Sequence, residues 1–178
     1  AMWFAVARGS GGSRGARDGD GLASAATAEA VLEASRAAVR ADEPERAIAM
    51  LRAAVAEHPT DSELRLALAE LLVRTGEHGA AADQFGAVID AGAADAGVLY
   101  AAGSVARLAG RPERAVEWLA EASRRASANP AYALHLGQAR LGLGDRAGAK
   151  ADLLRAANLD PGLAMAWGTL GEVALREN

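Results

Sequence analysis

Apolar side chains recur along this chain with a period of 34 residues from residue 28 onward. The clearest markers are four small residues at that spacing, Ala47, Ala81, Ala115 and Ala149. A bulky apolar side chain follows each of them four positions later: Leu51, Phe85, Leu119 and Leu153. A spacing of four places two residues on the same face of a helix. A fixed period of this length indicates stacked supersecondary units, each built from helices.

The period divides the chain into four frames and a half-frame: residues 28–61, 62–95, 96–129, 130–163 and 164–178. Each full frame shows two apolar helical patterns separated by a turn. Gly76, Gly110 and Gly144 occupy the same place in three of these turns, where the first helix needs a left-handed C-terminal cap. Asp42 takes that place in the first frame. We expect small residues where paired helices touch, and large ones between successive pairs.

The frames resemble the tetratricopeptide repeat family. The last unit carries Trp167, Leu170, Gly171 and Ala174 where the family has its Trp, Leu, Gly and Tyr or Ala. The fourth frame supplies further motif residues: Leu136, Gly137, Gly144, Ala149, Leu153, Ala156 and Pro161. The resemblance covers residues 28–178 without insertion or deletion. It implies an all-α fold, a right-handed superhelical solenoid of antiparallel helix pairs, with residues 164–178 as a half-repeat or capping helix.

In this family, peptide ligands contact fixed places on the first helix of each repeat, which lines a concave groove. The resemblance therefore implies a peptide-binding groove formed by Leu32, Arg36, Val39, Arg40, Leu66, Glu70, Val73, Arg74, Tyr100, Ser104, Arg107, Leu134 and Gln138. The apolar stripe with arginines beside it suits an amphipathic peptide of some acidic character. Alternatively, part of the stripe is ordinary packing between helices and the arginines form a solvated face. The groove lacks the Lys and Asn of the family members that clamp a terminal carboxylate.

Composition narrows the function. The formal net charge is −4, which argues against a nucleic-acid partner. The chain has no cysteine, which excludes disulfides and thiolate metal sites. His58, His78 and His135 fall in different frames without ligand spacing, so we expect no metal, no cofactor and no catalysis. No apolar run is long enough to span a bilayer, so we expect the repeats not to insert into a membrane.

Residues 1–27 lie outside the period. Residues 1–7 are apolar and include Trp3 and Phe4, and residues 8–20 are rich in Gly, Ser and Arg, as in a flexible tether. One interpretation makes Trp3 and Phe4 a ligand that occupies the groove of the same molecule or of a neighbour. A second makes the segment the stub of a transmembrane helix, and a third a disordered tail left from cloning.

We therefore predict a non-catalytic, cytoplasmic adaptor that binds a short peptide or helix of another protein. Two alternatives stay open. The repeats could assemble into a structural scaffold, as a homo-oligomer through the N-terminal segment or the C-terminal helix, where Met165, Trp167 and Leu175 leave apolar surface. The chain could also be a regulatory domain of a larger, membrane-anchored protein.

Overall fold

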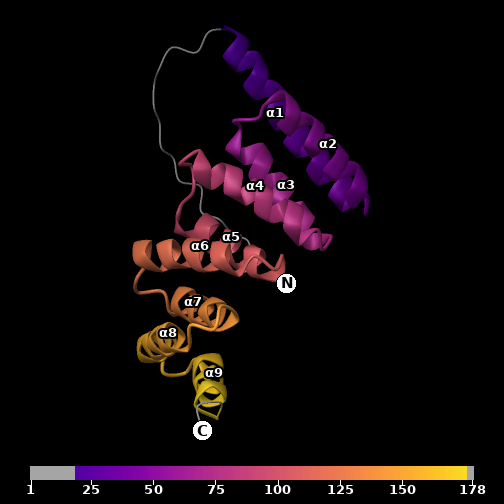
Figure 1. Ribbon diagram of the computed structural model, residues 1–178. Coiled ribbons are helices and arrows are strands. Elements are labelled where there is room, and N and C mark those ends of the chain that lie inside the picture. The colour runs from indigo at the N-terminus through magenta and orange to yellow at the C-terminus, as the bar shows by residue number, and fades with distance from the viewer. Residues whose placement is uncertain (1–18, 176–178) are drawn as a thin grey trace. The chain divides into compact units, whose positions relative to one another are not determined.

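The computed structural model describes residues 19–175, with side chains from residue 27 onward. Every regular element in this range is an α-helix, and the connections between helices are short (Figure 1). The helices are α1 (Gly19–Arg40), α2 (Pro44–Glu57), α3 (Ser62–Arg74), α4 (His78–Asp90), α5 (Ala96–Leu108), α6 (Pro112–Arg125), α7 (Pro130–Gly142), α8 (Arg146–Leu159) and α9 (Ala164–Leu175).

The sequence period fixes where the helices begin. The first helices of the repeats after α1 begin at Ser62, Ala96, Pro130 and Ala164. The second helices begin at Pro44, His78, Pro112 and Arg146. Both series advance by one period per repeat. The fold is an all-α solenoid of repeated helix pairs, in agreement with the prediction.

The turns inside the repeats carry the predicted left-handed caps. Gly76, Gly110 and Gly144 have φ angles of +83°, +71° and +80°, and Asp42 has +60°. After α3, the amide of Gly76 donates to the carbonyl of Val73, and the next amide donates to a carbonyl five residues back. These bonds satisfy carbonyls that the end of the helix leaves open.

The first helix is longer than its frame. It begins at Gly19, so residues 19–27, which the sequence analysis placed outside the repeats, are helical. The stretch from Leu22 to Ala28 contains four alanines, and alanine is the strongest helix former. The candidate ligand residues Trp3 and Phe4 lie outside the described residues.

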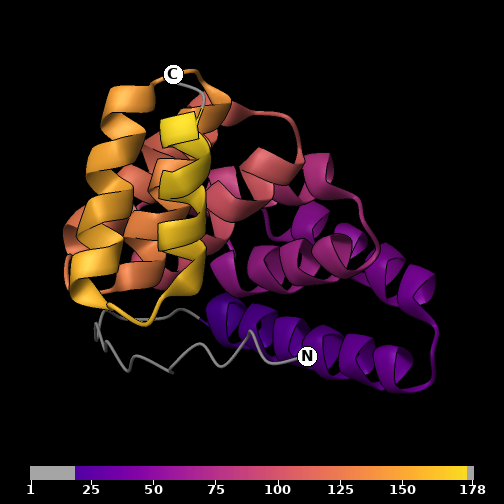
Figure 2. The same cartoon turned by 90° about the horizontal axis from the view of Figure 1, so that it is seen from below.

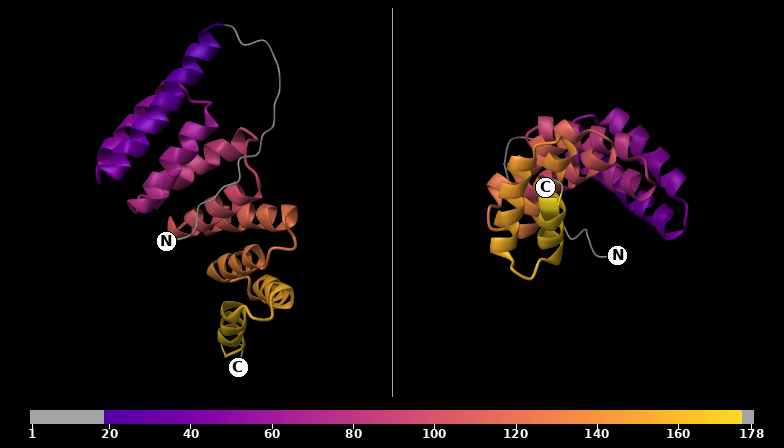
Figure 3. Two further views of the ribbon diagram at one scale, coloured as in Figure 1. Left: turned by 180° about the vertical axis from the view of Figure 1, so that it is seen from behind. Right: turned by 60° about the horizontal axis from the view of Figure 1, so that its bottom comes forward.

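The chain forms two compact units, residues 1–64 and residues 65–178. In the first unit, α1 packs against α2, with Leu32, Ala47 and Leu51 buried. In the second unit, each helix from α4 to α9 packs against the next, and the left view of Figure 3 shows α6 to α9 in chain order. First helices also meet directly, because α5 contacts α7 and α7 contacts α9. First helices thus form a continuous row within this unit.

Two buried glycines set the distance between paired helices in the second unit. A Cβ atom added at Gly103 of α5 would lie 2.5 Å from Cγ of Leu119 on α6. At Gly137 of α7 it would lie 2.8 Å from Cγ of Leu153 on α8. Both distances are shorter than a real carbon contact, so only glycine fits. The expectation that small residues stand where paired helices touch is confirmed at these two positions.

Candidate functional site

The predicted groove residues all lie on first helices, and they differ in exposure. Leu32, Tyr100 and Leu134 are buried, with 5%, 8% and 3% of their surface exposed, whereas Leu66 is half-buried. Side chains that are this well buried contribute mainly to packing between helices. The other members are more accessible: Arg36, Arg40, Arg74 and Arg107 are exposed, and Val39, Glu70, Val73, Ser104 and Gln138 are half-buried.

The arginines of α1 are engaged with a carboxylate on the same helix. Nη2 of Arg40 lies 3.0 Å from Oε1 of Glu33, and Nη1 of Arg36 lies 3.6 Å from Oε2. The hydrogen bond from Arg40 is the main reason why the pKa of Glu33 lies below its ordinary value. All three side chains are exposed, so water weakens these ion pairs. Their charges remain accessible to a ligand of this unit.

In the second unit, an aromatic cluster joins α5 to α7. The rings of Tyr100 and Tyr132 stack with their centroids 4.6 Å apart and an angle of 21° between them. His135 meets Tyr100 edge-on, with 5.1 Å between centroids, and its Nε2 lies 3.1 Å from the tyrosine hydroxyl. Tyr100 is among the groove residues predicted from the sequence, whereas its two partners on α7 are not. Their spacing of three on one helix was the available signal, since it places both on one face.

The cluster is uncharged at neutral pH. Burial raises the pKa of Tyr100 to about 12, although the Ser104 hydroxyl works in the opposite direction. Burial also raises the pKa of Tyr132 and lowers that of His135, with Arg107 adding to the second effect by repulsion. Exposed Arg107 is therefore a positive group at the edge of a neutral aromatic surface.

One polar atom of the cluster lacks a hydrogen bond. Nδ1 of His135 is buried, and no group within the described part of the chain bonds to it. Because His135 is neutral, Nδ1 is a hydrogen-bond donor in one tautomer and an acceptor in the other. A buried polar atom without a partner costs free energy, and because this atom is covered, a ligand at the surface does not reach it.

A cavity of about 420 Å³ lies between the second helices α4 and α6 and the start of the first helix α5. Its lining includes apolar Ile89, Leu99 and Trp118 and the charged Glu121 and Arg125. Nε of Arg125 lies 2.7 Å from Oε1 of Glu121, and its Nη1 donates to the Ala94 carbonyl at 2.6 Å. The lining charges are thus already paired within the chain. The sequence analysis did not predict this cavity, because its walls come from two frames.

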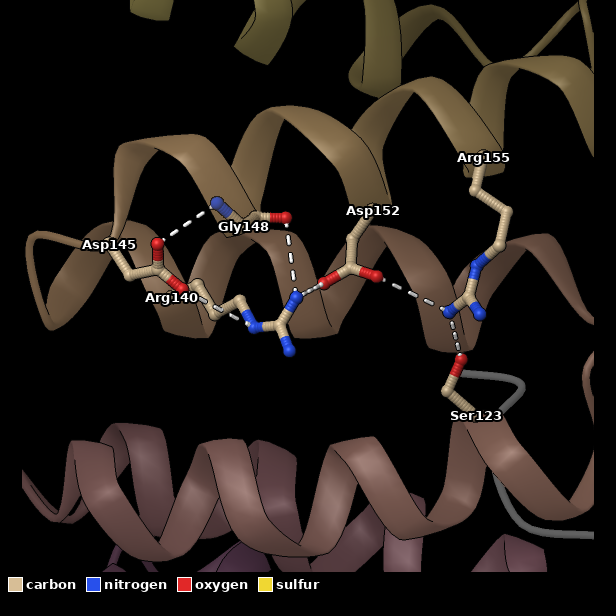
Figure 4. Close-up of polar contacts among 6 residues, drawn as sticks. All are labelled: Ser123, Arg140, Asp145, Gly148, Asp152 and Arg155. Atoms are coloured by element: carbon tan, nitrogen blue, oxygen red, sulfur yellow. Dashed lines mark hydrogen bonds and ion pairs between the residues drawn. The ribbon is translucent and has the colours of Figure 1, made fainter.

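A buried polar network connects α6, α7 and α8 (Figure 4). Asp152 on α8 is only 8% exposed, and its Oδ2 accepts a 2.6 Å hydrogen bond from Nη1 of Arg140. Arg155 lies 3.5 Å from the other carboxylate oxygen and donates to the Ser123 hydroxyl. Burial raises the pKa of Asp152, and the two arginines offset part of that rise. These residues hold consecutive repeats together, and most of their polar groups are bonded to one another.

Residues 19–175 contain no group of three or more His, Asp or Glu side chains arranged to hold a metal ion. None of the helices in this range is both long enough and apolar enough to cross a membrane.

Comparison with known families gives two matches. One tetratricopeptide repeat profile matches residues 38–103, and a second matches residues 131–163. A comparison with curated protein sequences gives no match.

Solved structures of similar fold share little sequence with this chain. YrrB, described as a TPR protein with an unusual peptide-binding site, is 21% identical, with a TM-score of 0.72 over 83% of this chain and 77% of YrrB. MamA from Desulfovibrio magneticus RS-1, from residue 41 to its end, is 21% identical, with a TM-score of 0.74 over 84% and 85% of the two chains. Another MamA structure is 16% identical, with a TM-score of 0.75 over 83% and 80%. At these identities the likeness establishes the fold alone.

Proposed function

The chain belongs to the tetratricopeptide repeat family, and we propose that it is a non-catalytic protein-interaction module whose first helices bind a short amphipathic peptide or helix. A fold of this family indicates protein or peptide partners. The proposal places the centre of the binding surface on α5 and α7, around Tyr100, Tyr132 and His135. We call these three residues, with Ser104 and Arg107, the aromatic surface.

The observation that carries the proposal is the neutral aromatic cluster that joins α5 to α7, with the half-buried Tyr132 ring and the exposed Arg107 at its surface. Half-buried Tyr132 offers an apolar ring with a hydroxyl at its tip, a combination that suits protein interfaces. An apolar side chain of the peptide could cover the ring.

The charge beside the aromatic surface selects the kind of peptide. Arg107 is exposed and carries a guanidinium group, which binds carboxylates through paired hydrogen bonds. On α3, Arg74 is exposed as well. An acidic side chain flanked by apolar ones therefore matches the surface better than a basic peptide does.

The N-terminal segment is another candidate ligand, although it has no acidic side chain before Asp18. Trp3 and Phe4 supply apolar side chains on a stretch that precedes a Gly- and Ser-rich sequence, so they could reach a groove in the same molecule or in a neighbour. The relative YrrB has a peptide-binding site that is described as unusual, which supports the idea that this fold accommodates more than one mode of peptide binding. Deletion of residues 1–8 tests the segment: unchanged thermal stability and unchanged peptide affinity would exclude it as a ligand.

The experiment on the surface itself begins with a library of random 12-residue peptides, selected by display on the immobilised chain. Isothermal titration then measures the affinity of the strongest peptide. We expect Tyr132→Ala and Arg107→Glu each to weaken binding about tenfold, equivalent to about 1.4 kcal/mol. Arg114→Glu, at an exposed position on α6, is the matched control and should leave binding unchanged. Equal effects from all three variants, or none, would contradict the proposal.

A further inference from the structure

The cavity between α4, α6 and the start of α5 has apolar walls. Leu99 and Trp118, which are 2% and 6% exposed, and half-buried Ile89 line it. Its volume of about 420 Å³ falls within the range of about 300–1,000 Å³ that is typical of small-molecule sites in proteins. The peptide surface proposed above includes none of these residues.

Small residues leave the cavity accessible from outside. Gly92, Ala94 and Ala120 also line it, and none of them has a side chain that extends beyond Cβ. Gly92 is exposed, and a Cβ atom added there would meet nothing within 4 Å, so the cavity borders solvent at this point. A ligand can therefore enter without a rearrangement of the chain.

At the next junction between repeats, a polar network occupies the equivalent positions. Three residues of the cavity have equivalents one period later that interact with one another: Ile89, Trp118 and Glu121 correspond to Ser123, Asp152 and Arg155. Arg155 donates to the Ser123 hydroxyl and lies 3.5 Å from the Asp152 carboxylate, so these side chains bridge the two repeats. The side chains of isoleucine and tryptophan offer no acceptor for such a bridge. The junction of the second and third repeats therefore has apolar walls where the next junction has a bonded network.

The Trp118 ring is held in position at the cavity wall. A Cβ atom added at Gly86 of α4 would lie 3.6 Å from this ring, so the backbone of α4 packs closely against the indole. The guanidinium group of Arg114, one turn earlier on α6, lies over the ring at 5.7 Å from its centroid. An aromatic wall that is already ordered loses little side-chain entropy when a ligand packs against it.

The charged residues at the cavity include two arginines that share one carboxylate. Glu121 accepts hydrogen bonds from Nε of Arg124 at 2.8 Å and from Nε of Arg125 at 2.7 Å. These bonds, with that from Arg124 first, hold the pKa of Glu121 below its ordinary value, so the group is ionised at neutral pH. The other carboxylate of the lining, Glu117, pairs with Arg114 at 3.2 Å. Once each carboxylate is matched by one arginine, one guanidinium charge is left over.

Both arginines keep donor groups that the chain does not use. Arg124 bonds through Nε and Nη2, and Arg125 bonds through Nε and Nη1. Among the described side chains, residues 27–175, no hydrogen bond involves Nη1 of Arg124 or Nη2 of Arg125. Both side chains are exposed, so a carboxylate can replace the water at these groups.

We propose that this cavity binds a small apolar carboxylate, a molecule that combines one aromatic or branched aliphatic group with one carboxylate group. The apolar group packs against Trp118 and Ile89, and the carboxylate binds Arg124 and Arg125. An apolar amine does not match the site, because it would bring a second positive charge to the unbalanced guanidinium. A helix of a partner does not match it either, since a helix with its side chains is about 10 Å across.

The probe is naphthalene-2-acetate, and its neutral amide is the matched control compound. Nitrogen-15 correlation spectra of the complete chain, recorded while each compound is added, give the affinity and the location together. We expect saturable binding of the carboxylate with a Kd below about 1 mM. The largest shifts should fall on Gly92, Ala94 and the indole N–H of Trp118. The amide should bind at least about fivefold more weakly, because it lacks the charge that the arginines recognise.

Two variants of the chain locate the contact. Ala120→Leu places a larger side chain in the cavity and should weaken binding at least about tenfold; α8 already has Leu154 at the equivalent position. Arg124→Gln removes the unbalanced charge and should weaken binding of the carboxylate but not of the amide. Ala151→Leu and Arg146→Gln are the matched controls, because both positions are exposed on α8, do not line the cavity and should leave binding unchanged. Figure 2 shows α8 beside α9, which is drawn in yellow.

Four results would overturn the proposal. They are the absence of saturable binding, equal binding of the carboxylate and the amide, equal binding by the Arg124→Gln or the folded Ala120→Leu variant, and largest shifts outside the cavity. Circular dichroism verifies that each variant folds, and the Arg124→Gln result decides if Ala120→Leu does not.

Two further measurements separate this site from other occupants and from the peptide surface. Deletion of residues 1–8 should leave the affinity for the carboxylate unchanged. A gain in affinity would contradict the proposal, because Trp3 or Phe4 would then occupy the cavity. Tyr132→Ala, in the aromatic surface, should leave binding of the carboxylate unchanged, so the two sites fail or succeed separately.

Discussion

The hydroxyl of Tyr100 lies 3.1 Å from Nε2 of His135, and this contact joins the first helices of two consecutive repeats. The tyrosine hydroxyl can donate to Nε2 or accept from it, so this hydrogen bond forms with either tautomer of the neutral ring. The Tyr100 ring also stacks on that of Tyr132. The protonation of one histidine therefore sets the direction of a hydrogen bond within the proposed binding surface.

The stability of the chain should depend on that protonation. Burial, with Arg107 adding to it, holds the pKa of His135 below the ordinary value of 6.5. Below pH 6.5 the unfolded chain then binds this proton more readily than the folded chain, so the contribution present at neutral pH is lost as the pH falls. We expect His135→Gln to flatten the fall in the free energy of unfolding between about pH 7 and pH 5, as measured by urea denaturation.

The control for this measurement is Gly137→Ala, which destabilises the chain but keeps the histidine. Its free energy of unfolding should be lower at every pH, with the original slope. Parallel curves for the His135→Gln variant and the original chain would show that the histidine does not set the slope.

Two equivalent glycines of the first helices, Gly137 and Gly171, should respond differently to the same substitution. Gly137→Ala places a methyl group 2.8 Å from Cγ of Leu153, so we expect a loss of about 1–3 kcal/mol in the free energy of unfolding. Gly171→Ala meets no neighbour and should gain about 0.5–1 kcal/mol, because alanine favours the helix. Urea denaturation of both variants measures the difference, and equal effects would contradict the packing described for α7 and α8.

A glycine in place of Asp42 should stabilise the turn of the first repeat. Asp42 has a φ of +60° at a place where the next three repeats have glycine, and its negative charge lies at the C-terminal end of a helix. We expect Asp42→Gly to raise the free energy of unfolding by about 0.5–1 kcal/mol. Gly110→Ala, the reverse kind of change, should lower it by a similar amount. A loss of stability in the Asp42→Gly variant would mean that the carboxylate makes a stabilising contact.

The buried carboxylate of α8 should be costly to remove by itself. Asp152→Leu leaves Arg140, whose side chain is 29% exposed, without its 2.6 Å partner, and we expect a loss of about 1–3 kcal/mol. The double variant Asp152→Leu with Arg140→Met replaces the pair by apolar groups and should recover most of that loss. Thermal and urea denaturation of these two variants, of the single Arg140→Met variant and of the original chain complete a double-mutant cycle. Strictly additive losses would show that the two residues do not interact.

Helices and turns could be predicted from the sequence because each repeat contains its own signals for them, the apolar helical spacing and the turn residue. The frames of the period begin where the first helices after α1 begin, and the left-handed cap at Gly76 was predicted from the sequence alone. The aromatic surface was only half predicted. Tyr100 was chosen by its place in the frame, but Tyr132 and His135 meet it across two repeats, and a pattern read within one repeat carries no information on such pairs.

The burial of individual side chains was the other property that the position in the repeat did not predict. Leu32, Tyr100 and Leu134 share a place that contacts ligands in the family, yet here they are at most 8% exposed. How far a side chain at that place is covered depends on the residues of the adjoining helices, which differ from repeat to repeat. Trp167 shows the opposite case, since its equivalents Leu99 and Ala133 are covered and it is not.

The central claim is that the aromatic surface of α5 and α7 binds peptide, and chemical-shift mapping tests it most directly. The chain is labelled with nitrogen-15 and titrated with the peptide selected by display. We predict that the largest amide shifts fall on Ser104, Arg107, Tyr132 and His135 and their neighbours on these two helices. Largest shifts around Trp118 and Arg125, at the cavity between α4 and α6, would contradict the claim, as would a bound peptide that leaves α5 and α7 unshifted.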